Sequence, residues 1–521
     1  MASRYWVGGT ASWDATAGTK WALTSGGAGG QAIPTIADAV FFDAASGAVT
    51  CTIATGNTNA LSITCTGFTG TLTGTANIST AGSFILVTGM TYTYTGVLTI
   101  TDTATLTSAS KTFGSVTVNA AARVVTLSAA LTASATSTFT FTAGTLVLTS
   151  GSISTGTFSS SNTNTRAITV NAGTSVNINA ASGSLLMSTI TGLTLSGTFT
   201  VNLTVGGGSP SINYGITGGT VATALNLVVS ISPSASPGIL IGSGSYIGAL
   251  SLGAVGSGAV SGTYNACGSL TLSASGTYTN LNPTFLASGT LTCNGRTLGA
   301  TTINGSGITV TLGSALIGST LTVTQGTFTT SASNYAVTLS SFNSSNTNVR
   351  TITLNGSTVT LSGVNGFSMT TSTNATLNAG TSTISMTSAS AKTFGGGGLT
   401  YYNLNQGGAG ALTIIGSNTF NNIANTTQPA SVLFTAGTTN TFTSFSLSGT
   451  SGNLITIGSV TAASHTLSKA SGTVSVSFCS ISQSSATGGA TWRAFLSNGN
   501  VNGGNNTGWD FGATGNFLVF F

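Results

Sequence analysis

Charged side chains are almost absent from this sequence of 521 residues. Only 3% of the residues are Asp, Glu, Lys or Arg, against about a quarter in an ordinary soluble domain. There is no Glu, and the ten Lys and Arg residues are scattered singly. Nucleic-acid binding requires clustered cations that displace counterions from phosphates. The sequence therefore predicts no nucleic-acid partner, and we expect the cations to be isolated surface or turn residues.

The residues that build common catalytic and metal sites are also scarce. His465 is the only histidine. Asp102 is the only carboxylate in the long middle of the chain, whereas glycosidases need two carboxylates facing one cleft. We expect Asp38 and Asp43 to serve in caps or turns, and His465 to lie partly exposed on a strand. No catalytic, cofactor-binding or metal-binding residue is predicted, and no enzymatic activity is expected. The alternative is a carbohydrate-active enzyme that uses Asp38 and Asp43.

Cysteine is infrequent and its spacing is uninformative for metal binding. The five cysteines form no CxxC pair and make an odd total, so neither a zinc site nor a disulfide framework is indicated. We expect them to be small buried hydrophobic residues. A Cys51–Cys65 bridge is left as an alternative.

Long apolar runs are missing as well. No stretch approaches 18 apolar residues, so no membrane insertion is expected. The sequence at the amino terminus, MASRYWVGGT, lacks the basic and apolar regions of a Sec-type signal peptide. We therefore expect release by cell lysis, export by a signal-free route, or a sequence from which a leader has been trimmed.

What the chain does contain is short alternating apolar and small polar runs, such as TYTYTGVLTIT (91–101) and STFTFTAGTLVLT (137–149). This alternation is the pattern of half-buried strands, and helical periodicity is missing. Ala-Gly-Thr or Gln-Gly-Thr steps punctuate the runs, and glycine there permits the positive φ that such turns need. The glycines lie at Gly144, Gly173, Gly326, Gly380 and Gly437. The sequence predicts an all-β chain.

One polar stretch occurs twice. FSSSNTNTRAITVN (158–171) returns as FNSSNTNVRTITLN (342–355), and residues 111–171 and 296–355 are two versions of one longer segment. Such self-similarity is typical of repeat architectures. It favours a β-solenoid with about 20–25 residues per coil and on the order of 20 coils. Tandem β-sandwiches are the alternative. We interpret the repeated stretch as a turn whose arginine, Arg166 or Arg350, opens the next strand, with a sugar-binding loop as the alternative.

Thr-X-Thr strings occur throughout the chain. Flat ladders of threonine can order water, which raises an ice-binding hypothesis. The strings do not recur at one constant spacing in the sequence, and this irregularity speaks against that hypothesis.

The tryptophans lie near the two ends of the sequence, and none occurs between Trp21 and Trp492. We predict three segments: a Trp-rich cap or attachment segment (1–50), a strand-repeat array (51–470), and a C-terminal cap with an apolar terminal strand (471–521). A solenoid exposes its core at both ends and needs caps, and tryptophan buries the most area per residue. The residues predicted to serve in capping or assembly are Trp6, Trp13, Trp21, Trp492, Trp509, Phe517, Phe520 and Phe521.

The two terminal segments resemble known proteins. RYWVGGTASWDATAGTKW and the following residues resemble the opening segment of β-strand-repeat proteins from phages and environmental bacteria, and also the first coil of autotransporter passenger domains. SSATGGATWRAFLSNGNVNGGNNTGWDF resembles the terminal module of the same repeat proteins. The matching positions at the amino-terminal end are Trp6, Gly8, Gly9, Trp13, Trp21, Pro34, Asp38 and Phe41. The sequence shows neither a signal peptide nor a membrane barrel of an autotransporter, which favours the phage-type relatives.

The resemblance implies a non-enzymatic structural protein of a phage virion: a fibre, a spike or a head decoration. Such a protein would be assembled in the host cytoplasm and displayed on the virion surface. Its expected partners are capsid or tail proteins, copies of itself in a homo-oligomer such as a trimer, and a host-surface glycan. The alternative is an extracellular or cell-surface adhesin or filament subunit of a bacterium or archaeon.

Overall fold

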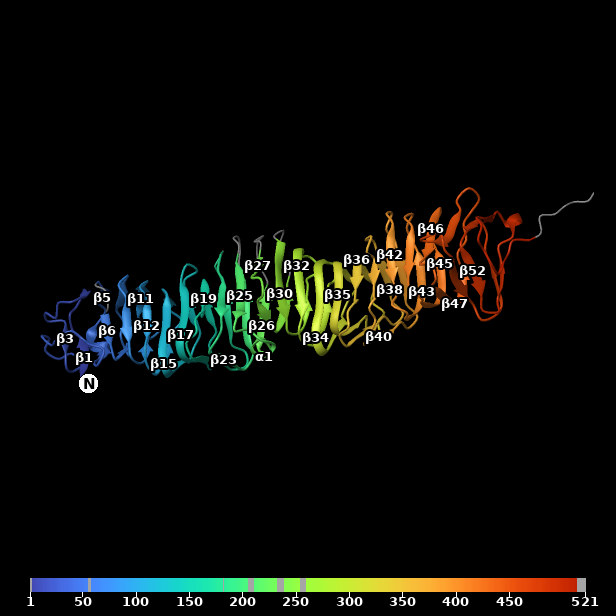
Figure 1. Ribbon diagram of the computed structural model, residues 1–521. Coiled ribbons are helices and arrows are strands. Elements are labelled where there is room, and N and C mark those ends of the chain that lie inside the picture. The colour runs from blue at the N-terminus through green and yellow to red at the C-terminus, as the bar shows by residue number, and fades with distance from the viewer. Residues whose placement is uncertain are drawn as a thin grey trace, which may run out of the picture. The chain divides into compact units, whose positions relative to one another are not determined.

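The computed structural model describes residues 2–54, 58–180, 182–204, 210–231, 239–253 and 259–512. It is all-β, with 54% strand and 2% helix, and its strands form about 21 turns of a β-solenoid (Figure 1). The chain divides into two compact units, Met1–Thr279 and Asn280–Phe521. The helical elements in the described residues are single turns: η1 (Ala44–Ser46), α1 (Val221–Ala224) and η2 (Leu496–Asn498). The prediction of an all-β solenoid is confirmed.

In the first unit most turns contribute a strand to each of three ladders, in which successive strands pair in parallel, one turn apart. Ladder A contains β1 (Ser3–Trp6), β4 (Ala39–Phe41), β7 (Ser62–Thr64), β10 (Phe84–Ile85), β13 (Ala104–Thr107), the second halves of β15 (Val116–Leu127) and β17 (Thr138–Leu148), β20 (Arg166–Val170) and β23 (Leu193–Ser196). Ladder B contains β2 (Ala11–Trp13), β5 (Thr50–Ile53), β8 (Thr71–Gly74), β11 (Thr91–Tyr94), β14 (Thr112–Phe113), β16 (Leu131–Ala133), β18 (Ile153–Thr155), β21 (Ser175–Ile178), β24 (Phe199–Leu203), β26 (Leu227–Ile231), β29 (Ala249–Leu252) and β31 (Leu270–Thr271). Ladder C contains β6 (Thr58–Ala60), β9 (Ile78–Thr80), β12 (Leu98–Ile100), the first halves of β15 and β17, β19 (Thr157–Ser159), β22 (Leu185–Thr189), β25 (Ser211–Thr217), β27 (Ile239–Ile241) and β30 (Ala259–Ala266), which also pairs with β28 (Tyr246–Ile247). Ladder B has no strand pair between β11 and β14, and β3 (Trp21–Ala22) pairs with β1 in the antiparallel sense.

The second unit is built the same way, and β32 (Thr277–Phe285) lies across the boundary in the sequence. Ladder D contains β33 (Gly289–Thr292), the last residues of β34 (Thr297–Leu312) and β35 (Leu316–Thr329), β37 (Arg350–Thr353) and β40 (Ala375–Asn378). Ladder E contains the first residues of β34 and β35, then β36 (Val337–Asn343), β38 (Thr358–Leu361), β41 (Thr383–Met386), β43 (Thr400–Gln406), β45 (Thr419–Asn425) and β47 (Thr439–Ser446). Ladder F contains the middle of β34 and β35, the end of β36, β39 (Phe367–Ser368), β42 (Lys392–Gly395), β44 (Leu412–Ile415), β46 (Ala430–Phe434), β48 (Ile455–Ser459), β51 (Cys479–Ile481) and β54 (Val501–Asn502). β47 also pairs with β49 (His465–Ser468) and through it with β52 (Ser484–Thr487), while β50 (Thr473–Ser475), β53 (Thr491–Arg493) and β55 (Trp509–Asp510) form a separate sheet.

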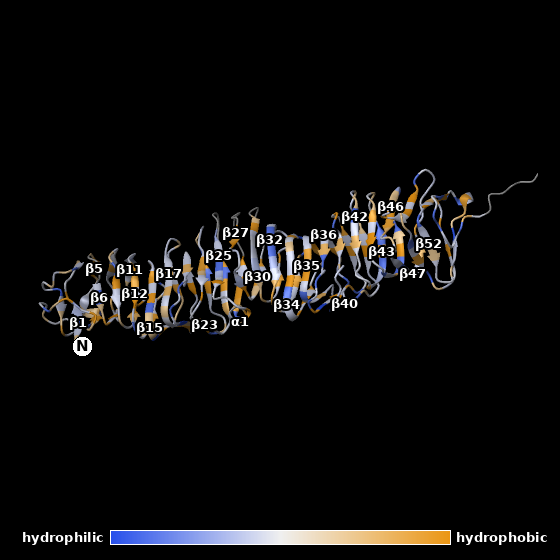
Figure 2. Cartoon of the chain, viewed as in Figure 1, coloured by the Kyte–Doolittle hydropathy of each residue, from blue (hydrophilic) through white to orange (hydrophobic). Residues whose placement is uncertain are grey.

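The core of each unit is a set of stacked inward-facing residues. Alternate residues of a strand point inward, so parallel pairing in register places like side chains above one another. In the second unit Phe342, Phe367 and Phe394 stack with ring centroids 5.0 and 4.9 Å apart. In the first unit Phe139 stacks on Phe158 at 5.5 Å. Figure 2 shows hydrophobic residues recurring along both units rather than gathering in one segment.

Hydrogen bonds between turns agree with the predicted coil length in many turns, whereas the turn from Phe199 to its strand partner Leu227 is longer, at 28 positions. Thr107 and Ser128, 21 positions apart, share one such bond, and Ser345 and Thr370, 25 positions apart, share another. The five Ala-Gly-Thr and Gln-Gly-Thr glycines all have positive φ, from +59° at Gly380 to +96° at Gly144, as the sequence predicts. Gly144 lies within β17, where the chain turns from ladder C to ladder A.

Candidate functional sites

The repeated polar stretch is built around a buried arginine. Arg166 opens β20, lies directly above Gly144 in register, and is 1% exposed. Its Nε donates to Ser160 Oγ at 2.8 Å. Its two terminal nitrogens donate to four carbonyl oxygens, those of Ser160, Asn164, Thr189 and Thr191, at 2.6 to 3.1 Å. The guanidinium therefore joins its own loop to the loop of the next turn.

The second copy repeats these contacts bond by bond. Arg350 opens β37 above Gly326 and is also 1% exposed. Its Nε donates to Ser344 Oγ at 2.8 Å and to the carbonyl of Ser344 at 3.0 Å. The carbonyls of Ser344, Asn348, Thr371 and Thr373 accept from the terminal nitrogens at 2.6 to 2.9 Å. Burial lowers the pKa of both arginines, but a guanidinium stays protonated in proteins.

The polar side chains of these loops are engaged with the chain itself. Asn162 and Asn164 donate to the carbonyls of Phe141 and Thr142, and Ser160 Oγ donates to the carbonyl of Phe141. In the second copy the equivalent donors, Ser344, Asn346 and Asn348, bond to the carbonyls of Val323 and Thr324. The predicted role as a turn that precedes a strand is confirmed at both places. These bonds leave little free hydrogen-bonding capacity for a sugar.

The expectation that the cations lie at the surface or in turns is wrong for three of them. Arg166, Arg350 and Lys392 are each 1% exposed. Lys392 Nζ donates to the carbonyls of Ser388, Gly408 and Gly410, and burial lowers its pKa to about 8. Backbone carbonyls can replace the hydration shell of a buried cation. The distribution of charged residues along the sequence does not reveal which cations are held in this way.

An aromatic cluster fills the first turns of the chain. Trp6, Trp13 and Trp21 are all buried and pack with Trp–Trp ring centroids 5.1 and 4.9 Å apart. Phe42 contacts all three indoles, and Phe68 continues the stack at 5.3 Å. These indole faces contact one another rather than solvent.

A second cluster lies in the last described turns. Trp492 and Trp509 pack edge to face at 5.1 Å, with Phe445 beside both. They are 2% and 9% exposed, and their indole nitrogens donate to the Thr487 carbonyl and to Ser484 Oγ. Phe517, Phe520 and Phe521, the predicted residues of the apolar terminal strand, lie outside the described residues.

Asp38 and Asp43 near the amino terminus have local structural roles, as predicted. Asp43 caps η1 and forms a reciprocal pair of hydrogen bonds with Ser46. Asp38 accepts from the backbone and hydroxyl of Thr35 at 3.0 and 2.8 Å. Burial by itself raises the pKa of Asp38, but the Thr35 bonds and the charge of Arg4 outweigh it and lower that pKa.

The predicted partial exposure of His465 is wrong. The side chain is 0% exposed, and its ring stacks on Phe434 at 4.7 Å. Ser459 Oγ lies 2.9 Å from Nδ1, whereas Nε2 has no hydrogen-bond partner among the described residues. Burial lowers the pKa of His465 to about 4, so the imidazole is neutral at pH 7.

The five cysteines are buried free thiols, as the sequence predicts, and Cys51 and Cys65 are not bridged. Burial raises the pKa of four of them to about 12 and that of Cys51 still further. A thiol held in this protonated form is a poor nucleophile and a poor metal ligand.

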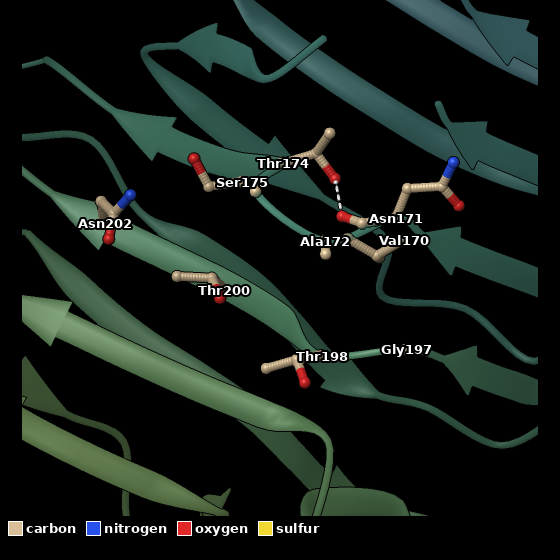
Figure 3. A pocket seen from close by; sticks show the side chains of 10 residues that line it. Val170, Asn171, Ala172, Thr174, Ser175, Gly197, Thr198, Thr200 and Asn202 are labelled. Carbon is tan, nitrogen blue, oxygen red and sulfur yellow. Dashed lines mark hydrogen bonds between the residues drawn. The ribbon is translucent and has the colours of Figure 1, made fainter. Parts of the chain in front are cut away.

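A shallow groove of about 620 Å³ lies where the segment 170–175 faces Gly197 and the start of β24 (Figure 3). Its lining is neutral, and part of it is engaged internally: Asn202 donates to Asn177, and Thr174 donates to the carbonyl of Asn171. In the ranges that the structure describes, no cluster of three or more His, Cys or Asp side chains could hold a metal ion. No helix in the same ranges is long and apolar enough to cross a membrane.

Comparison with known proteins identifies no family for this chain. Its sequence matches no protein-family model and no curated protein, and its structure matches no solved structure. The likeness of its two ends to phage-type repeat proteins stays a prediction.

Proposed function

We propose that this chain is a non-enzymatic structural protein of a phage virion, serving as a fibre, a spike or a head decoration on the particle surface. The observation that carries the proposal is the paired arginine motif. Both copies use a buried cation to join one turn to the next, and none of their donors is left for a ligand. A structural solenoid must keep its turns together under force, and buried polar groups that join neighbouring turns serve that purpose.

The composition supports the same role. Stability comes from parallel backbone ladders, stacked phenylalanines and buried polar hydrogen bonds. Salt weakens these interactions far less than it weakens ion pairs at the surface. Two ion pairs occur in the described ranges, Lys20–Asp14 and Arg123–Asp102. A surface built this way tolerates changes in ionic strength, as a particle outside its host must.

The aromatic clusters fit the role of solenoid caps. A solenoid leaves its core and strand edges open where the ladders begin and end. Trp6, Trp13 and Trp21 bury large ring areas in the first turns, and Trp492 and Trp509 do so in the last described ones. Attachment to capsid or tail proteins, or to further copies in a homo-oligomer, would then use other surfaces.

The test is quantitative mass spectrometry of particles purified on density gradients from lysed cultures of the source. The proposal expects peptides of this chain to co-purify with the major capsid protein at a fixed ratio, which also gives the copy number. Recovery from the cell envelope or from extracellular filaments, with none in the particles, would overturn it in favour of the adhesin or filament alternative.

A further inference from the structure

The only histidine of the chain lies in the core of the last described turns. His465 opens β49, its side chain is 0% exposed, and its ring stacks on Phe434 of β46. Two more turns follow it, which contain the strands from β50 to β55 and are red in Figure 1. We call residues 473–512 the end turns.

One serine connects the histidine to the aromatic cluster of the end turns. The strand register places His465 beside Ser484 of β52, which is also 0% exposed. The Ser484 hydroxyl accepts a buried hydrogen bond from Nε1 of Trp509 at 3.0 Å. Trp509 in turn packs on Trp492. The end turns therefore cover the imidazole on this side, and water can reach it there only if they move away.

The site has a place for one proton on the imidazole but not for two. Nδ1 lies 2.9 Å from Ser459 Oγ, which can itself donate to the carbonyl of Gln483 at 3.4 Å. In either tautomer Nε2 is buried and has no hydrogen-bond partner among the described residues. An imidazolium carries an N–H on both nitrogens. The second N–H would be a charged donor without an acceptor, which is costly in a buried site.

No charged group nearby compensates for a second proton. The residues that contact the ring or flank it on the neighbouring strands are all neutral: Phe434, Thr438, Ser459, Gln483 and Ser484. The charged residues of β49 and the end turns lie at the surface: the ammonium group of Lys469 donates to the Thr443 carbonyl in an exposed bond, and Arg493 and Asp510 are exposed. Burial is the cause that lowers the pKa of His465 to about 4.

The end turns are the most weakly paired part of the second unit around this histidine. β54 and β55 contain two residues each, and β50, β51 and β53 contain three, whereas β46 and β48 contain five. Short strands share few backbone hydrogen bonds with the turn before them. These turns should therefore open at a lower free-energy cost than the rest of the unit.

We propose that His465 is an acid switch that keeps the end turns closed at neutral pH and opens them when the pH falls. Above pH 6.5 the imidazole is neutral in the closed and in the opened form, so it does not favour opening. As the pH falls from 6.5 towards 4, the opened form takes up the proton and the closed form does not. Opening makes the indoles of Trp492 and Trp509 accessible, together with the edges of β48 and β49. The change belongs to the chain itself and does not depend on its place in a virion.

The test is hydrogen exchange of the full chain at pH 7.5 and pH 5.0, corrected for the pH dependence of intrinsic exchange. With a pKa of 6.5 in the opened form and about 4 in the closed form, the opened population at pH 5.0 rises on the order of 30-fold. Protection of residues 473–512 should fall by this factor. β37 (Arg350–Thr353), in the same unit, is the internal reference.

Two variants separate the histidine from other acid effects. His465→Phe can still stack on Phe434 but cannot take up a proton. Asp510→Asn is the matched control, because it removes the one exposed carboxylate of the end turns and leaves the histidine in place. Thermal melting at pH 7.5 verifies that each variant is folded. A second readout needs no variant: acrylamide quenching of tryptophan fluorescence in the wild type, recorded between pH 7.5 and 4.

The expected result is that the wild type and Asp510→Asn lose protection in the end turns at pH 5.0 while β37 keeps it, and that folded His465→Phe keeps protection in both. Quenching of the wild type should rise as the pH falls below 6.5. Unchanged protection and quenching in the wild type would overturn the proposal. So would an equal loss at β37, a loss in His465→Phe as large as that in the wild type, or a response that disappears in Asp510→Asn.

Discussion

Replacing Arg350 with methionine removes the guanidinium and keeps an apolar chain of similar length. Four carbonyls, those of Ser344, Asn348, Thr371 and Thr373, then lose their charged partner, and the hydrogen bonds that they had accepted were buried or partly buried. At about 1 kcal/mol for each acceptor left without its bond, the free energy of unfolding should fall by about 4 kcal/mol. Arg350→Lys supplies only three donors from one point and should cost about 2 kcal/mol.

The assay is urea unfolding followed by far-UV circular dichroism, with hydrogen exchange on the same variants. Solenoid turns are stabilised chiefly by their neighbours, so exchange should rise first in residues 371–373 and in the loop that precedes Arg350. The control is Arg123→Met, because Arg123 lies exposed in an ion pair with Asp102 and its loss should cost only about 0.5 kcal/mol. If Arg350→Met costs no more than the control and the exchange pattern is unchanged, the arginine does not join the turns.

Three further outcomes are expected. The folded pKa of His465, about 4, lies below the ordinary value of 6.5, so its stabilising effect is complete above pH 6.5 and is lost as the pH falls from 6.5 to 4. The free energy of unfolding should fall by about 3 kcal/mol over this pH range. His465→Phe can still stack on Phe434, so thermal melts of this variant between pH 6.5 and 4 should show a much weaker dependence on pH. Gly144→Ala should destabilise the fold by about 2 kcal/mol or more in urea melts, because φ is positive at Gly144 and a Cβ would collide with the Ala120 carbonyl. Gly173→Ala is the control and should cost less, because φ is positive there but the added Cβ would meet open space. The five buried thiols should fail to react with an aromatic disulfide reagent at pH 8 until urea unfolds the chain, and rapid labelling of the native protein would contradict the burial described here.

The sequence predicted the architecture well because that architecture rests on short-range patterns. Alternation of apolar and small polar residues determines which side chains face the core, and positive-φ glycines mark the corners. The duplicated stretch around Arg166 and Arg350 added the long-range signal of a repeat. These features required no knowledge of which strands pair.

The details that the sequence did not predict depend on contacts between turns. Burial of Arg166 and Lys392 requires carbonyls from a loop one turn away, which no local pattern reveals. The tetrapeptide Lys-Thr-Phe-Gly illustrates the limit: Lys392 is buried in it, whereas Lys111, in the same tetrapeptide, is only half-buried. The recurrence of an arginine after the same polar loop was the available signal that the position is structural.

Cryo-electron microscopy of the source particle tests the proposed function most directly. The account predicts density on the capsid or tail into which both solenoid units fit turn by turn, with side-chain density for the buried Arg166 and Arg350 bridging adjacent loops. Particles that lack such density, with the same solenoid found in cell-envelope filaments, would contradict it.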